Sequence, residues 1–257
     1  MDLKQYLEKV KTNWFIPMPP KEKIFVGGSD ADFRQIGVDT LGSLIEVGHV
    51  KPVSKVLEIG SGIGRVALPL TQWLDSTGRY VGTDIVKHGV DWCIENISSR
   101  YENFRFLHMD IYNEYYNPQG KERIVDLPLE GRYFDVAVFN SVFTHLVADD
   151  TSAYLKLVAK HLAKGGFLWG TWFIMDADAR NLVRGNRSSL NFILGDGNTF
   201  HLDENGVSTA AVAYDIDYVK ESLSTAGFEI ERLDLGKWCD RTTEFGGYQD
   251  LIVARLA

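Results

Sequence analysis

The chain has 257 residues, of which 45% are hydrophobic, and a formal net charge of −8. This length and apolar content suffice for one sizeable core, so we expect a single domain over residues 1–257. The acidic balance and the lack of any Lys/Arg run argue against a nucleic-acid-binding protein. We therefore expect a small-molecule partner and no nucleic acid.

The cysteines and the N-terminus indicate the compartment. Cys93 and Cys239 lie far apart and form no CxxC pair, which argues against a disulfide framework or a zinc site. The N-terminal MDLKQYLEKV is charged and lacks the apolar core of a signal peptide. No apolar run reaches the roughly 18 residues of a membrane helix. We expect a cytoplasmic protein with reduced thiols and no membrane span.

The first part of the chain, residues 1–45, is expected to form an N-terminal cap segment. A short helix is followed by WFIPMPP, a stiff and extended connector rich in proline. A second helix is then predicted by apolar residues at helical spacing, namely Phe33, Ile36, Leu41, Leu44 and Ile45.

From residue 55 onward, short β-branched runs alternate with helical stretches. Strands are expected at 55–60, 79–85, 104–111, 134–142, 165–174, 228–236 and 248–256, and helices at 64–74, 90–101, 149–163 and 215–227. This alternation predicts an α/β fold with a mostly parallel sheet and helices on both faces. The last two strands have no helix between them and are expected to pair antiparallel.

A cluster of glycines follows the first of these strands. The stretch VLEIGSGIGR contains Gly60, Gly62 and Gly64. Glycines at this point permit a tight strand-to-helix turn and a close approach of a ligand to the backbone. The dinucleotide motif GxGxxG would need a glycine where Arg65 stands, and Glu58 would repel a pyrophosphate. The pattern favours a ligand with an amino acid head, whereas close helix–sheet packing is the alternative reading of the glycines.

The sequence EIGSGIG resembles motif I of the class I S-adenosylmethionine (SAM)-dependent methyltransferases. The resemblance covers roughly residues 25–257, and the later motifs follow in order. It implies a Rossmann-like, seven-stranded, mostly parallel sheet with an antiparallel final strand pair, and SAM as cofactor. The cofactor-binding residues that it implies are Glu58, Gly60, Gly62, Gly64, Asp84, Ile85, Asp110, Ile111 and Asn140.

Two aspartates at strand ends have implied roles in this family. Asp84 ends YVGTD, where an acid binds the two ribose hydroxyls through its two oxygens. Asp110 follows the third strand and holds the adenine edge together with Ile111. Each aspartate alone could be a turn former, since this residue favours such corners. Together with Glu58, the two aspartates make three acidic positions at successive strand ends, and this set favours cofactor binding.

Two segments are predicted to contact the molecule that accepts the methyl group. His145, in NSVFTHL after the fourth strand, is the candidate general base, because its ordinary pKa suits proton abstraction near neutral pH. The alternative is a histidine that shapes the cofactor pocket. The loop KWCDRTTEFGGYQD places Trp238, Arg241 and Tyr248 where this fold often lines the acceptor pocket, with ordinary edge packing as the alternative. We expect residues 175–214 to form an insertion near that pocket.

The residues after the fourth strand indicate which kinds of methyl transfer to expect. Nucleic-acid amino methyltransferases typically place [DN]PP[YF] where this chain has Asn140-Ser141-Val142-Phe143. Asn140 is neutral where metal-assisted O-methyltransferases carry a carboxylate, so no metal is expected. The sequence is similar overall to bacterial small-molecule and saccharide methyltransferases. We expect O-methylation of a small hydroxylated molecule, such as a saccharide or glycolipid intermediate. The sequence does not indicate the oligomeric state.

Two other functions are weighed against this one. A nicotinamide-dependent oxidoreductase is disfavoured by the GxGxG spacing and by Glu58. A non-catalytic protein with the SAM-binding fold is disfavoured by the complete set of donor-site residues.

Overall fold

The computed structural model describes residues 2–13, 16–27, 32–121, 123, 126–129, 131, 134–195, 197–202, 207 and 209–257. It divides into two compact units. The first unit contains residues 1–109 and 134–138, and the second contains residues 110–133 and 139–257. The expectation of a single domain over the whole chain stays a prediction.

Strands and helices alternate over residues 55–108 and again over residues 134–172. The helices and helical turns are α1 (Leu3–Lys11), η1 (Lys21–Lys23), α2 (Phe33–Glu46), α3 (Ala67–Leu70), α4 (Lys87–Cys93), η2 (Ile94–Ser98), η3 (Phe143–His145), α5 (Ala148–His161), α6 (Ala177–Arg184) and α7 (Ile216–Thr225). The strands are β1 (Lys55–Ile59), β2 (Arg79–Asp84), β3 (Phe104–His108), β4 (Phe134–Phe139), β5 (Leu162–Trp172), β6 (Ile174–Met175), β7 (Phe192–Leu194), β8 (Thr199–Leu202), β9 (Val212–Asp215), β10 (Phe228–Asp234) and β11 (Asp250–Leu256).

The main sheet has seven strands in the order β10-β11-β5-β4-β1-β2-β3. Strand β1 pairs in parallel with β2, and β2 pairs in parallel with β3. At the other end, β10 and β11 pair antiparallel, as do β11 and β5. The predicted α/β fold, with its mostly parallel sheet and antiparallel final pair, is confirmed.

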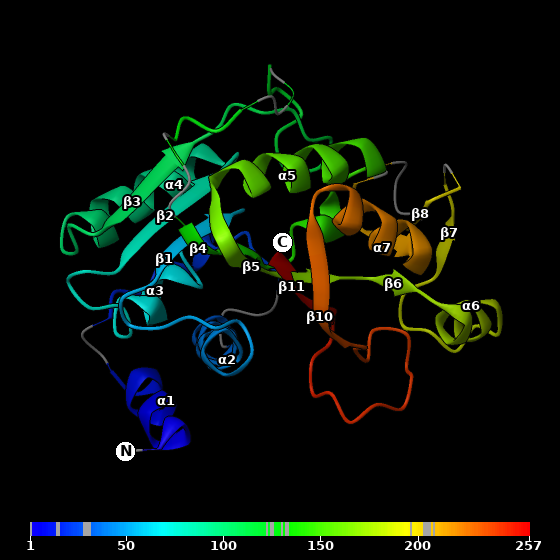
Figure 1. Cartoon of the computed structure of the whole chain (residues 1–257), viewed down its shortest axis with the longest axis horizontal. Helices are drawn as coiled ribbons and strands as arrows, with labels where there is room; N and C mark the ends of the chain where they lie inside the picture. Colours follow the sequence, from blue (N-terminus) through cyan, green and yellow to red (C-terminus); the bar gives the residue numbers. More distant parts are fainter. Residues whose placement is uncertain are drawn as a thin grey trace. The chain divides into compact units, whose positions relative to one another are not determined.

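In the first unit, β1, β2 and β3 lie side by side (Figure 1). The run Val56–Ile59 is buried along its whole length, as expected of a parallel strand covered on both faces. Helix α2 packs against α1, and its Arg34 donates hydrogen bonds to the carbonyl oxygens of Lys11, Asn13 and Ile16. The guanidinium of Arg34 thus holds the backbone of the N-terminal segment.

The helix predicted over residues 64–74 is much shorter than expected. Only Ala67–Leu70 form α3, and hydrogen-bonded turns flank it on both sides. Gly64 has φ of 83°, which no right-handed helix contains, so helical geometry begins only after it. The apolar residues of this stretch are buried all round, which obscured the helix limits in the sequence.

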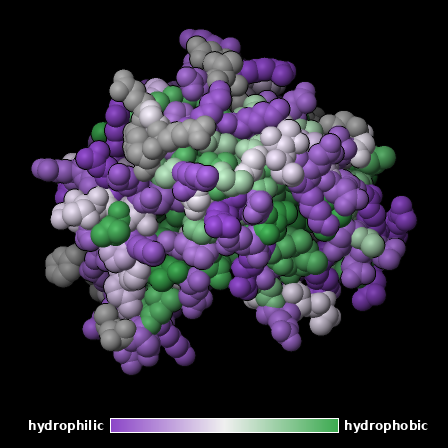
Figure 2. Space-filling view, in the orientation of Figure 1, coloured by the Kyte–Doolittle hydropathy of each residue, from purple (hydrophilic) through white to green (hydrophobic). Residues whose placement is uncertain are grey.

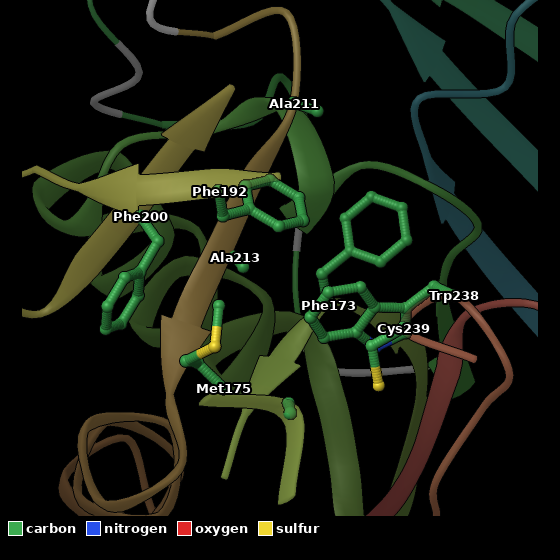
Figure 3. Packing of buried hydrophobic residues seen from close by; sticks show 9 residues of the cluster. Phe173, Met175, Phe192, Phe200, Ala211, Ala213, Trp238 and Cys239 are labelled. Atoms are coloured by element: carbon green, nitrogen blue, oxygen red, sulfur yellow. The ribbon is translucent and has the colours of Figure 1, made fainter. Parts of the chain in front are cut away.

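The second unit contains a second sheet, which the sequence did not predict. Four strands are ordered β6-β9-β8-β7, and together with α6 they occupy much of the segment 175–214 that was predicted to be an insertion. Their side chains share one apolar cluster with the loop after β10 (Figure 3). The members of this cluster are Phe173, Met175, Ala179, Phe192, Phe200, Ala211, Ala213, Trp238 and Cys239. The strands have two to four residues each, too few to show a period of two.

Hydrophilic residues predominate on the face shown in Figure 2, with scattered hydrophobic patches between them. Among the described residues, no helix combines the length and the apolar character needed to cross a membrane.

Candidate functional site

The turn after β1 is built on glycines in the left-handed region. Gly60, Gly62 and Gly64 have φ values of 74°, 56° and 83°, which side chains with a Cβ rarely adopt. The backbone N–H groups of Gly60 and Ser61 both donate to the carbonyl oxygen of Thr83, at 2.8 and 3.0 Å. The three predicted glycines thus form one turn, which β2 holds in place.

Asp84 closes this turn from the end of β2. One carboxylate oxygen accepts the N–H of Gly62 at 2.6 Å, and the other accepts the N–H of Val86 at 2.7 Å. The side chain is 8% exposed, and burial raises the pKa of Asp84 despite these backbone hydrogen bonds. Each carboxylate oxygen has a second lone pair, so Asp84 retains acceptor capacity for a pair of ligand hydroxyls.

Glu58 lies in β1 beneath the turn and is 1% exposed. The hydroxyl of Tyr80, which is fully buried on β2, donates a hydrogen bond to Glu58 Oε2. Burial raises the pKa of Glu58 to about 8, so the carboxyl group is mainly protonated at neutral pH when no cation faces it. The sequence placed Glu58 near a cationic ligand but gave no sign of this protonation.

This buried acid predicts a pH-dependent stability. The folded pKa of Glu58 is about 8, above its ordinary value of 4.5. The folded state therefore retains a proton that the unfolded chain loses, and stability falls as the pH rises from about 4.5 to about 8. Glu58→Gln should remove that loss and unfold with a free energy about 3 kcal/mol higher than wild type at pH 7. Urea titrations at pH 5 and pH 7 measure the difference.

The control for that titration is Glu95→Gln, which alters an exposed carboxyl group on η2. We expect its stability to follow that of the wild type at both values of pH. Equal pH dependence in the wild type and in Glu58→Gln would contradict a buried, protonated Glu58.

Residues of the N-terminal segment lie against the glycine turn. A Cβ at Gly62 would come within 2.6 Å of Val26 Cγ1, and one at Gly89 would come within 2.8 Å of the Phe25 ring. Arg65, which is 9% exposed, donates a hydrogen bond to the carbonyl oxygen of Gly27. Arg65 thus joins the turn to the segment 24–27.

The turn carries one polar atom that suits a bound ligand. The hydroxyl of Ser61 is buried and has no hydrogen-bond partner among the described residues. Buried hydroxyls are normally paired, so this one suits a polar ligand group. Helix α3 has four residues and starts after the turn, so its N-terminus adds no anion site. The buried acids and the unpaired hydroxyl together fit a ligand with hydroxyl and ammonium donors.

The predicted residues of the second unit begin with Asp110 and Ile111. Asp110 is exposed, and its oxygens lie 3.4 Å from Asn117 Nδ2 and 3.9 Å from Lys121 Nζ. Ile111 is 8% exposed, and its carbonyl oxygen accepts a hydrogen bond from Asn117 at 3.0 Å. Asn117 therefore fixes the backbone of the predicted adenine-binding pair.

Ser141, next to the half-buried Asn140, is a residue that the sequence analysis did not single out. It has φ of 60° although it has a Cβ, a conformation that often marks functional loops. Its N–H donates to Thr171 Oγ1 and its hydroxyl to Gln249 Oε1, both at 2.8 Å. Ser141 thus connects the end of β4 to β5 and to the residue after Tyr248, and no sequence signal indicated this.

His145 ends the helical turn η3 and is half-buried. Its Nδ1 lies 3.1 Å from the carbonyl oxygen of Thr209, which can only accept, so Nδ1 carries the proton. Nε2 is then the basic nitrogen, and the Tyr116 hydroxyl lies 3.5 Å from it. The ring of Tyr115 lies nearly parallel to the imidazole at 6.1 Å, and burial lowers the pKa of His145.

The three residues predicted to bind the acceptor differ in exposure. Trp238 is fully buried in the apolar cluster of Figure 3. The Arg241 side chain is 7% exposed and forms two hydrogen bonds with Asp176, at 2.8 and 3.0 Å. Tyr248 is 51% exposed, and its ring meets Phe173 edge-on at 6.2 Å. Of the three, Tyr248 presents the most surface to a ligand.

Asp250 is a structural residue in this unit. It is fully buried at the start of β11 and accepts hydrogen bonds from the N–H groups of Ile174 and Gly236 and from the Trp238 indole, at 2.6, 2.6 and 2.8 Å. Burial raises the pKa of Asp250 to about 6. These three hydrogen bonds fit a structural role for Asp250 better than ligand binding.

Among the described residues, no group of three or more His, Cys, Asp or Glu side chains is arranged to hold a metal ion.

Comparisons with known proteins agree with the family that the sequence of the glycine turn predicts. A family model described as a methyltransferase domain matches residues 56–166. A SAM-dependent methyltransferase from Methanosarcina mazei is 19% identical with a TM-score of 0.55, over 82% of this chain and 96% of that one. Magnesium protoporphyrin IX methyltransferase from Synechocystis PCC 6803 is 16% identical with a TM-score of 0.55, over the whole of both chains. Residues 56–166, fewer than half of the chain, thus match a methyltransferase domain.

This methyltransferase domain includes the glycine turn, Asp84 and Asp110, so the family predicted from EIGSGIG is confirmed. The Synechocystis enzyme is known with S-adenosylhomocysteine (SAH) and with SAM bound, in agreement with SAM as the cofactor. The fold also occurs in the [4+2]-cyclase SpnF, which is 15% identical with a TM-score of 0.53 over 90% of this chain and 72% of that one. The fold alone therefore does not determine the reaction.

Proposed function

We propose that this chain transfers a methyl group from SAM to a hydroxyl group of a small molecule, such as a saccharide or a glycolipid intermediate, by in-line displacement. The main support is the bond from Gly62 N–H to Asp84, which joins the predicted motif I turn to the predicted ribose-binding acid within the first unit. SAM supplies an activated methyl group on a sulfonium.

In this proposal residues of the first unit bind the ribose and the methionine part of SAM. Asp84 accepts hydrogen bonds from the ribose hydroxyls, with Ile85 beside it, and the glycine turn gives the methionine part room. Glu58 lies near the cationic end, and the unpaired Ser61 hydroxyl is a further donor. The roles that the resemblance implies for Asp110 and Ile111 at the adenine, and for Asn140, stay predictions.

On the acceptor side we assign the general base to His145, because Nε2 is its basic nitrogen in the tautomer that Thr209 selects. Tyr248 offers an exposed ring and hydroxyl to the acceptor. The substrate-binding roles of Arg241 and Trp238 stay predictions; the contacts described above hold both side chains in the protein. Transfer of the hydroxyl proton of the acceptor to His145 Nε2 would leave the oxygen with an electron pair for a bond to the methyl carbon, while the bond from that carbon to the sulfonium breaks and SAH leaves.

Replacement of Asp84 tests the cofactor site. Asp84→Ala should weaken SAM binding by about 1–3 kcal/mol, because two ribose hydroxyls lose their acceptor. Isothermal titration calorimetry with SAM measures the dissociation constant. Asp91→Ala is the matched control, since it removes a carboxylate on α4 that pairs with Lys87 at 2.7 Å. The same dissociation constant for both variants would overturn the assignment of Asp84.

The [4+2]-cyclase neighbour makes a direct product assay necessary. A panel of phenols and saccharides should yield at least one acceptor whose addition releases SAH. Binding of SAM with no SAH release across that panel would favour the non-catalytic alternative.

A further inference from the structure

A buried tyrosine lies against the acid of the glycine turn in a way that the proposed function does not use. Tyr80 is fully buried, and its hydroxyl donates to Glu58 Oε2. In the part of the chain that the structure describes, we find no second side-chain donor to this carboxyl group. A phenol that serves only to fill a core would not need a carboxyl partner, because phenylalanine would fill the same space.

Several features of the sheet fix the Tyr80 ring in this position. On the neighbouring strand β3, Phe104 stacks on the ring at 5.0 Å, and Phe106 lies 5.4 Å away. Gly82 pairs with Glu58 in the β1–β2 ladder, and a Cβ on Gly82 would lie 2.8 Å from the Tyr80 hydroxyl. The glycine therefore leaves the space through which the hydroxyl reaches the acid.

Gly82 also brings the Tyr80–Glu58 pair close to the glycine turn. A Cβ on Gly82 would also lie 2.8 Å from Ser61 Cβ, so the turn and the Tyr80 hydroxyl meet over one glycine. The carboxyl group of Glu58 is thus held directly beneath the segment that we assign to the methionine part of SAM.

We propose that Tyr80 is a positioning residue, which orients the carboxyl group of Glu58 toward the cationic cofactor and makes cofactor binding release a proton. The inference rests on the proposed function, because it takes SAM to be the ligand of the turn. SAM carries an ammonium and a sulfonium, and either cation favours the ionised form of Glu58 over the protonated one. The proton of Glu58 then passes to solvent.

The groups around Glu58 determine how readily its carboxyl group loses the proton. Burial and the charge of Asp84 raise the pKa of Glu58, whereas the Tyr80 hydrogen bond and the charge of Arg65 lower it. The nearby thiol of Cys93 has a raised pKa of its own and stays neutral. The Tyr80 hydroxyl thus stabilises the carboxylate that the cofactor needs, and its loss should make that carboxylate harder to form.

Calorimetric titration with SAM between pH 6 and pH 9, in buffers of different ionisation enthalpy, tests the inference. The wild type should release up to about one proton per SAM near neutral pH, and its affinity should rise with pH until Glu58 is ionised. Tyr80→Phe should bind SAM about tenfold more weakly at pH 7, with the rise in affinity moved to higher pH. Glu58→Gln should release no proton and show no such rise.

Tyr101→Phe is the matched control. Tyr101 meets Phe104 edge-on at 5.9 Å in the same aromatic group, but its hydroxyl contacts Gln72 at 3.2 Å. This variant should reproduce the wild-type pH profile. A profile of Tyr80→Phe that matches Tyr101→Phe, or proton release that persists in Glu58→Gln, would overturn the inference. If Tyr80→Phe does not fold, the proton count of Glu58→Gln decides. Absence of SAM binding by the wild type would instead overturn the proposed function.

Discussion

His145→Ala should lower the rate of methyl transfer by about 10²–10⁴-fold while leaving the dissociation constant of SAM unchanged. The expected loss is that of the general base which we propose for the acceptor hydroxyl. Its position is fixed by the hydrogen bond from Nδ1 to the carbonyl oxygen of Thr209. The measurement is the rate of SAH release with an acceptor found in the panel of phenols and saccharides, alongside calorimetry with SAM.

His145→Gln separates the base from a structural role. Glutamine can still donate to the Thr209 carbonyl oxygen, but its amide takes up no proton near neutral pH. We expect this variant to be as slow as His145→Ala, and full activity would return His145 to the role of shaping the pocket. Because burial lowers the pKa of His145, the acid limb of the wild-type rate profile should lie below pH 6.5.

Asp250→Ala should reduce the free energy of unfolding by about 3–5 kcal/mol, since three buried donors lose their acceptor and each unpaired donor costs about 1–3 kcal/mol. The donors are the N–H groups of Ile174 and Gly236 and the Trp238 indole. Urea unfolding followed by tryptophan fluorescence measures the loss, and Asp250→Asn should be destabilised as well.

The control for Asp250 is Glu231→Ala on the neighbouring strand β10. Glu231 pairs with Arg255 at 2.9 Å, where both side chains are well exposed. Surface ion pairs contribute about 0–1 kcal/mol, so this variant should remain close to the wild type. A loss for Asp250→Ala no larger than that of Glu231→Ala would show that the three donors find other partners.

The main sheet was predictable because its strands carry their signal locally. Runs such as Val56–Ile59 are short, apolar and followed by glycines, and these features do not depend on distant residues. The motif residues Glu58 and Asp84 were found for the same reason, since each ends or nearly ends such a run. Their protonation was not predictable, because it depends on burial and on Tyr80, which is 22 residues away from Glu58.

The second sheet and its core depend on contacts between distant residues. Trp238 and Phe192 meet at 5.4 Å although 46 positions separate them, and neither stretch has a periodic pattern long enough to predict a strand. An aromatic residue in a polar loop, such as Trp238, looks the same in sequence whether it binds a ligand or fills a core. Only the fold shows that this one is fully buried.

The left-handed conformation of Ser141 was hidden from the sequence for a different reason. Asparagine or glycine at such a position would have suggested positive φ, whereas serine does not. Its stabilising partners, Thr171 and Gln249, lie 30 and 108 positions away.

The proposal as a whole depends on the turn of Gly60, Gly62 and Gly64, with Glu58 and Asp84, being a SAM site. Calorimetric titration of the wild-type protein with SAM and, separately, with NAD tests this most directly. We expect SAM to bind and NAD not to bind. Binding of NAD without binding of SAM would contradict the account.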